Sequence, residues 1–221
     1  MDKKEALKII LECAKLYNKN LVNKNVMFIC RNKQQQLFVF EVLFLPRNFL
    51  HLTGIKIMNK EIDSSIKFYR ACLSNKLDVS DFKYSEDGTT IMKLRVLTQV
   101  MNLHKVSKMF GEYNNIKSYL FTEKITGNVT ACVGFIGDNG FYVPNTALKE
   151  DIRNMVVPES RSTIIYTFIK TKDNKLYSTI TYVSDNYNLE KLFKSKDILN
   201  KIDLENIEPL DEENTKLNDS K

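Results

Sequence analysis

Glycine and histidine are both scarce in this chain of 221 residues, which contains seven glycines and two histidines. No GxxxxGK[ST] or GxGxxG sequence occurs, so the loops that usually hold nucleotide phosphates are missing. HExxH and GxSxG are missing as well, which removes the signatures of many zinc proteases and of α/β-hydrolases. We therefore expect that any catalysis by this chain needs no metal and no cofactor.

The four cysteines lack the spacing of a metal or redox site. Cys13, Cys30, Cys72 and Cys132 are widely separated, and no CxxC pair or neighbouring histidine accompanies them. Zinc sites and redox dithiols normally show such pairs. We expect reduced thiols that are mostly buried.

Long apolar runs are also missing. No segment approaches the roughly 18 apolar residues of a membrane-spanning helix, and charges interrupt the first residues, MDKKEALKIILECAK, too often for a signal peptide. We therefore expect a soluble, cytoplasmic protein with no membrane partner. Its 43% hydrophobic content is enough for a substantial core.

Charge is distributed unevenly along the chain. Residues 203–221 hold seven acids against two lysines, and because the whole chain carries +6, residues 1–202 carry +11. A basic body favours polyanions such as RNA or DNA, although a genome of biased base composition also produces lysine-rich surfaces. The acidic end is either a solvated, disordered tail or a segment that folds over the basic face and competes with a nucleic acid.

Helical and strand patterns alternate in the first half. Residues 3–20 have the spacing of an amphipathic helix. Residues 26–31 and 37–45 are apolar runs on either side of a polar turn, which predicts a β-hairpin. Helices are predicted over 62–75, capped by Asp63 or Ser64, and over 89–110, where the first residues also fit a strand.

The second half is rich in β-branched and aromatic residues. Strands are predicted over 116–122, 129–136, 141–143, 162–171 and 176–183, with hairpin turns at GDNG and KDNK. A short helix is expected after Pro144, and another over 188–202. The predicted fold class is α+β, with N-terminal helices packed on a four- to five-stranded antiparallel sheet. The predicted divisions are a helix at 1–20, a domain at 21–187, a helix at 188–202 and the tail at 203–221.

The segment FLHLTGI, residues 49–55, is the strongest candidate for a site. His51 sits there among small polar groups, with Thr53 two residues on, Arg47 shortly before it and Gly54 permitting a turn. A neutral imidazole beside such groups suits acid/base chemistry near neutral pH. The alternative is that the apolar residues of this segment are core and His51 is structural.

Cleavage of RNA without a cofactor needs a proton acceptor for the 2′-hydroxyl, a proton donor for the leaving oxygen, and cations near the phosphate. We predict that His51 fills an acid/base role and that Lys170, in TFIKTKD, stabilises charge. Thr53 and Thr146 complete the catalytic group. The predicted RNA-binding residues are Arg47, Arg161 and Tyr177. Lys170 equally fits a solvent-facing strand end, and His104 follows an apolar helical stripe, which favours a core position.

Three stretches resemble a known family. FLHLTGI, GDNGFYVPNTALKEDIR and STIIYTFIKTKDNKLYSTITY are similar to the phage and mobile-element branch of the barnase/EndoU/colicin/RelE-like nucleases, in its fourth subgroup, over about residues 21–187. The resemblance implies helices followed by a four-stranded antiparallel sheet, barnase/RelE-like, and a metal-independent endoribonuclease. It places His51 and Thr53, Thr146 and Lys170 at the active site.

Two departures from the family pattern leave a second hypothesis open. A second histidine has no counterpart apart from His104, and the usual Ser-Lys before the last hairpin reads Ile169-Lys170. If activity is lost, the fold serves as a binding module. The partner is then a host protein or nucleic-acid complex, such as a defence complex blocked in the manner of an anti-CRISPR protein, with Asp211, Glu212 and Glu213 mimicking a nucleic acid.

Overall fold

The structure, a computed structural model, describes residues 1–185 and 195–208. The elements in chain order are α1 (Lys3–Asn20), β1 (Lys24–Arg31), β2 (Leu37–Phe44), η1 (Pro46–Asn48), α2 (Phe49–Thr53), β3 (Ile55–Ile57), α3 (Ser65–Leu73), β4 (Phe82–Tyr84), α4 (Thr89–Val100), α5 (Leu103–Val106), β5 (Met109–Glu112), β6 (Lys124–Gly127), β7 (Cys132–Asp138), β8 (Phe141–Leu148), η2 (Ile152–Asn154), η3 (Pro158–Ser160), β9 (Ser162–Thr171), β10 (Thr179–Val183) and α6 (Lys196–Leu199).

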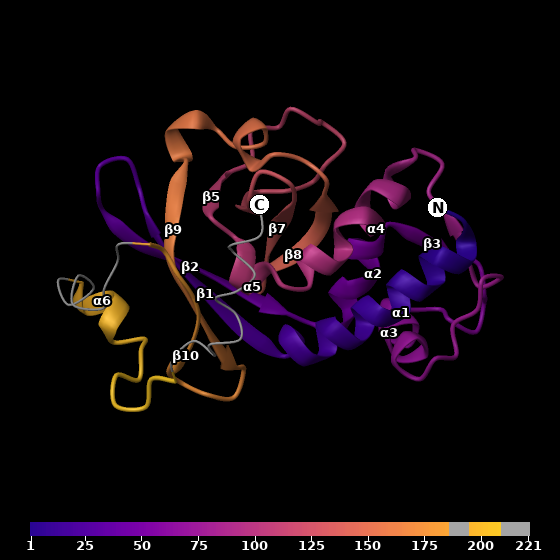
Figure 1. Ribbon diagram of the computed structural model, residues 1–221, viewed down its shortest axis with the longest axis horizontal. Helices are drawn as coiled ribbons and strands as arrows, with labels where there is room; N and C mark the ends of the chain where they lie inside the picture. The colour runs from indigo at the N-terminus through magenta and orange to yellow at the C-terminus, as the bar shows by residue number, and fades with distance from the viewer. Residues whose placement is uncertain (186–194, 209–221) are drawn as a thin grey trace.

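Seven strands of the described part close into a barrel, in the order β1-β2-β8-β7-β6-β5-β9, with β1 and β9 completing the ring. The eighth strand, β10, pairs with β9 outside this ring. Strand β9 is ten residues long, so one of its edges pairs with β1 while the other holds β5 at its start and β10 at its end. Figure 1 shows the labelled strands of the ring in the left and central parts of the view.

The predicted fold of N-terminal helices on a four- to five-stranded antiparallel sheet is therefore wrong. The prediction treated the β1–β2 hairpin as separate from the C-terminal strands, whereas β1 pairs with β2 and β9 along its whole length. The ring also contains one parallel contact, where Val42 of β2 pairs with Tyr142 of β8. Pairing between residues so far apart in the chain leaves no local pattern in the sequence.

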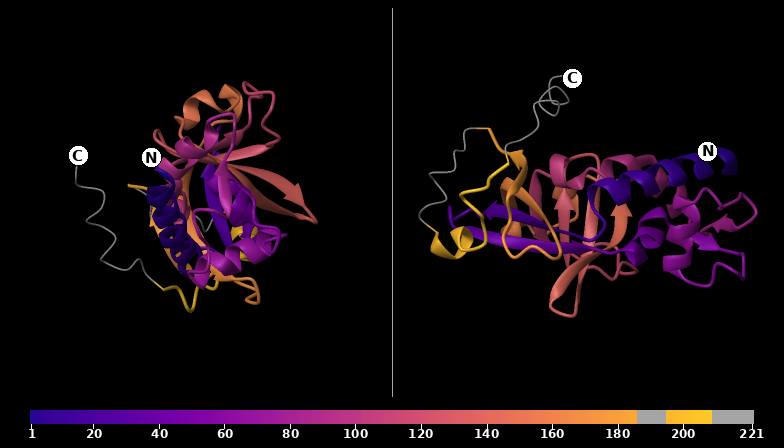
Figure 2. Two further views of the ribbon diagram at one scale, coloured as in Figure 1. Left: turned by 90° about the vertical axis from the view of Figure 1, so that its right-hand side faces the viewer. Right: turned by 90° about the horizontal axis from the view of Figure 1, so that it is seen from below.

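The helices α1 to α4 lie together beside the barrel, at its right in Figure 1 and in the right-hand view of Figure 2. Aromatic rings join them: Tyr17 of α1 packs edge-on against Tyr69 of α3 at 5.8 Å, and Phe49 of α2 stacks over Phe68 at 6.0 Å. Such pairs add to the stabilisation from apolar burial. The predicted helix over 3–20 is confirmed, and Ser64 caps α3 as predicted.

The segment following Pro144 is a strand, not the predicted helix. A β-bulge shifts the β7–β8 register, so that Phe135 pairs with Pro144 and Gly134 with Thr146, leaving Asn145 as the extra residue. A bulge tolerates the missing N–H of proline. The predicted hairpin turn at GDNG is confirmed, since Asn139 and Gly140 both have positive φ between β7 and β8.

Two further predictions fail between residues 89 and 122. The helix predicted over 89–110 ends at Val100, and the chain continues as α5 and then β5. Residues 116–122 form a loop, not a strand, and Tyr119 and Phe121 point their rings into solvent. Apolar residues that favoured a strand there are instead exposed on the surface.

At its C-terminal end, the described part of the chain extends to residue 208. Ile198 of α6 and Ile202 pack against Tyr177 and the outer face of β9 and β10. Only part of the helix predicted over 188–202 is described, and the acidic residues Asp211, Glu212 and Glu213 lie outside the described residues. All four cysteines are free and buried, as predicted. No described helix is long and apolar enough to cross a bilayer.

Candidate active site

The HLTG residues form the end of a helix. Thr53, the last residue of α2, donates its hydroxyl proton to the carbonyl of Leu50 at 2.7 Å. Gly54 follows with φ +70°, a left-handed conformation that stops helices and that glycine adopts without strain. Leu52 and Thr53 are fully buried, while His51 is on the exposed side. Three of the four residues are thus structural, and His51 alone presents its side chain outward.

This helix end is fixed to the first turns of α4. Thr90 donates its hydroxyl proton to the carbonyl of Gly54 at 2.6 Å, and the ammonium of Lys93 donates to the carbonyl of His51 at 3.1 Å. The methylene chain of Lys93 passes so close to Gly54 that a Cβ there would stand 2.7 Å from Lys93 Cδ. Gly54 therefore lets α2 and Lys93 approach each other.

A cavity of about 540 Å³ opens beside His51. We call it the His51 cavity. Its walls come from α2, β3, the start of α3, the turn before α4 and the bulge of β8. Its lining residues are Leu50, His51, Gly54, Ile55, Lys56, Ile57, Ile62, Asp63, Ser64, Ser65, Ser85, Asp87, Thr89, Lys93 and Asn145. Its size is that of a small-molecule or nucleotide site.

The charges in this cavity favour a neutral imidazole beside a cation. Partial burial, and then the positive charge of Lys93, lower the pKa of His51 below its usual 6.5. Burial also lowers the pKa of Lys93, while Asp87 opposes that change. Asp87 itself accepts hydrogen bonds from the backbone and hydroxyl of Thr89, so its carboxylate is held at the start of α4. No described residue hydrogen-bonds the His51 ring, which leaves it available to a ligand.

Lys170 lies elsewhere. It is near the end of β9 and pairs in register with Asn25 of β1, so β1 separates it from β2 and from the α2 helix that follows. Its ammonium donates to the carbonyl of Lys175 at 2.7 Å and lies 4.6 Å from the centre of the Tyr177 ring. It does not line the His51 cavity. The structure therefore does not bring His51 and Lys170 to one cleft.

Tyr177 and Thr146 are buried. The Tyr177 hydroxyl donates to Glu41 at 2.9 Å, and Lys201 donates to the other oxygen of the same carboxylate at 2.6 Å, which ties the segment around α6 to β2. Burial and Glu41 raise the pKa of Tyr177.

Thr146 is 4% exposed within β8, and its hydroxyl has no hydrogen-bond partner among the described residues.

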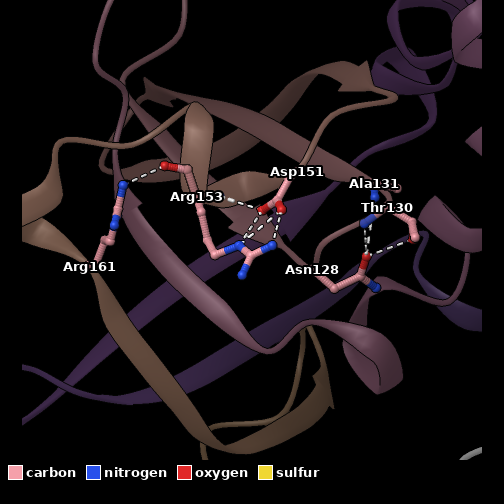
Figure 3. A network of polar contacts seen from close by, with 6 residues as sticks. All are labelled: Asn128, Thr130, Ala131, Asp151, Arg153 and Arg161. Atoms are coloured by element: carbon pink, nitrogen blue, oxygen red, sulfur yellow. Dashed lines mark hydrogen bonds and ion pairs between the residues drawn. The ribbon is translucent and has the colours of Figure 1, made fainter.

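The two predicted arginines have acidic or backbone partners. Arg47 forms an ion pair with Asp138 in the β7–β8 hairpin. Arg161 donates to the backbone carbonyl of Arg153 at 2.6 Å, and Arg153 in turn holds Asp151, as Figure 3 shows. Neither arginine lines the His51 cavity.

Lys93 and Asn145 are two polar residues of the cavity that the sequence did not single out as site residues. Lys93 is one of many lysines, and only the contact between α2 and α4 singles it out. Asn145 follows Pro144 in the segment that was expected to be a helix, but the bulge turns its side chain toward the 116–122 loop, where it donates to the carbonyl of Phe121 and accepts from Thr122. A proline inside a strand pattern was the available signal for that bulge.

Comparison with known proteins identifies a family. A family described as phage-Barnase-EndoU-ColicinE5/D-RelE like nuclease4 matches residues 9–186, which begins inside α1 and includes the whole barrel. No curated protein and no solved structure matches the chain significantly. No group of three or more His, Cys, Asp or Glu side chains suited to a metal ion occurs within residues 1–185 and 195–208.

Proposed function

The chain belongs to the phage-Barnase-EndoU-ColicinE5/D-RelE like nuclease family, and from this premise we propose that it is an endoribonuclease whose reaction is carried by side chains of the His51 cavity. His51 acts in acid/base transfer and Lys93 as the cation at the phosphate. The observation that carries the proposal is that these two side chains line one cavity, where the Lys93 ammonium donates a hydrogen bond to the His51 carbonyl.

In the proposed reaction, neutral His51 accepts the proton of the 2′-hydroxyl. The freed oxygen attacks the adjacent phosphorus, the bond from phosphorus to the 5′ oxygen breaks, and a 2′,3′-cyclic phosphate and a 5′-hydroxyl are formed. Because its pKa is lowered, His51 is largely neutral near pH 7, as a proton acceptor must be. Bases of this kind contribute roughly 10²- to 10⁴-fold to a rate.

Lys93 has two tasks in this proposal. Its ammonium stabilises the extra negative charge of the pentacoordinate phosphorus, and a partly desolvated cation does so better than one in bulk water. Its lowered pKa also suits it to give a proton to the departing 5′ oxygen. Lys93 therefore takes the role that the sequence pattern suggested for Lys170. Thr53 positions His51 by closing the helix end.

The test is degradation of mixed cellular RNA by the purified full-length chain in EDTA. We expect wild-type protein to cut RNA, and His51→Ala to lose cleavage by about 100-fold or more while its melting temperature stays within a few degrees. Lys8→Ala, which removes an exposed lysine on α1, is the matched control and should cut like wild type. Inactivity of the wild type on every RNA, or full activity of His51→Ala, contradicts the proposal.

A further inference from the structure

A second cavity, of about 240 Å³, adjoins the His51 cavity. We call it the Tyr119 cavity. Asp87, Thr89 and Lys93 line both cavities, so the two adjoin at the start of α4, and we call them together the trough. The second cavity differs in its walls, because Met92 and Leu148 give it apolar surface and the exposed ring of Tyr119 stands at its side.

The loop that carries Tyr119 is held at both ends. At its start, the Tyr113 hydroxyl donates to the carbonyl of Lys117 at 2.8 Å and accepts from the Lys117 backbone N–H at 2.9 Å. The Lys117 side chain pairs with Glu150 at 2.5 Å. At its end, Asn145 binds the carbonyl of Phe121 and the hydroxyl of Thr122. The loop is therefore held at both ends, beside the Tyr119 cavity.

This fixed loop exposes aromatic surface. Tyr119 is 68% exposed and Phe121 is 85% exposed. Exposed apolar surface that is gathered in one place marks interaction sites, and these two rings lie two residues apart in a loop whose ends are held. Tyr119 lines a cavity that shares three residues with the His51 cavity, so a ligand that covers the Tyr119 ring can extend into the proposed active site.

The geometry points to a base-stacking subsite: the Tyr119 cavity takes the unpaired base of a nucleotide next to the cleaved phosphate, with the base lying on the Tyr119 ring. This inference rests on the proposed function, since it assigns the substrate of that site as single-stranded RNA. Aromatic rings stack on bases of any sequence, and lysines hold the backbone between them. Lys93 and the exposed Lys149 line the same trough and supply that charge.

The experiment measures binding, so that it stays separate from catalysis. Full-length His51→Ala protein is titrated with a short fluorescent single-stranded RNA, and with the same RNA annealed into a duplex. Tyr119→Ala and Tyr119→Phe are each added to the His51→Ala protein. Phe141→Ala, which removes an exposed aromatic ring that lines neither cavity, is the matched control.

We expect Tyr119→Ala to weaken binding of the single strand by about fivefold or more, and Tyr119→Phe and Phe141→Ala to change it little. Duplex binding should be the same for all variants, because paired bases hide their faces. Unchanged single-strand affinity in Tyr119→Ala, an equal loss on duplex, or no binding of single-stranded RNA at all would overturn the subsite. If Tyr119→Ala weakens binding but the wild type cuts no RNA, the subsite stands and the proposed endoribonuclease fails.

Discussion

Lys93 and His51 are linked through the backbone, because the Lys93 ammonium donates to the His51 carbonyl at 3.1 Å while its methylene chain crosses Gly54. One lysine thus holds the end of α2 against α4 and places a positive charge beside the imidazole. The same contact explains why a glycine follows Thr53, since any side chain at that position meets Lys93.

Replacing Gly54 should therefore cost more than conformational strain. Gly54→Ala and Gly88→Ala both place alanine at a φ near +70°, which costs roughly 1–2 kcal/mol. Nothing lies within 4 Å of a Cβ at Gly88, whereas one at Gly54 stands 2.7 Å from Lys93 Cδ. Chemical denaturation should show a larger loss of unfolding free energy for Gly54→Ala, and that variant alone should lose RNA cleavage. Equal losses would mean that the Lys93 contact is unimportant.

The pKa of His51 should report the charge of Lys93. The chain has two histidines, and burial holds the pKa of His104 at about 3, so only His51 titrates near neutral pH in an NMR titration. Lys93→Met removes a positive charge but keeps a similar chain, and should raise the His51 pKa. Lys56→Met, which alters another lysine of the same cavity, should leave it unchanged. A His51 pKa that is unaffected by Lys93→Met would show that the two groups are not electrostatically coupled.

The roles of Lys93 and Lys170 can be distinguished by the effect of their substitution on RNA cleavage. We expect Lys93→Met to reduce the rate at saturating RNA by about 100-fold or more, because it removes charge stabilisation. Lys170→Ala should cut RNA at nearly the wild-type rate, since its ammonium is bound to Lys175 and Tyr177. Melting temperatures control for folding. The reverse pattern would place the reaction at β9 instead of the His51 cavity.

His104 should make the fold sensitive to acid. Burial, and then Lys105 and Lys24, lower its pKa from 6.5 to about 3, so below pH 6.5 the unfolded chain binds a proton that the folded chain does not. Above pH 6.5 the titration of His104 does not reduce the free energy of unfolding. Below pH 6.5 it reduces this free energy by about 1.4 kcal/mol for each pH unit, down to about pH 3. His104→Gln should show a shallower loss of stability over that range. Equal slopes for the two proteins would contradict the assignment.

Local patterns predicted the elements better than their assembly. The β1–β2 hairpin and β9 matched because each is a run of apolar and β-branched residues between turn signals. The unbroken burial of residues 26–30 shows that both faces of β1 are covered, yet which strands pair with its edges depends in part on contacts more than 130 residues apart. An apolar run in the sequence does not carry that information.

The candidate site was predictable only in part, for the same reason. His51 stands out because histidine is rare and its neighbours end a helix, which sequence spacing reveals. Lys93 is indistinguishable from other lysines until α4 docks on α2. Lys170 was predicted as the cation because it lies near the end of a strand. In the sheet, β1 lies between β9 and β2, and the helix of His51 follows β2.

The rate of single-turnover cleavage of a defined RNA in EDTA tests the account most directly. The same strand with one 2′-deoxynucleotide at the cut position is the matched substrate. We predict that wild-type protein cuts the RNA to a 2′,3′-cyclic phosphate and leaves the deoxy strand intact, and that His51→Ala, with normal melting, cuts neither. Cleavage of the deoxy strand, or an undiminished rate in His51→Ala, would show that His51 does not activate the 2′-hydroxyl.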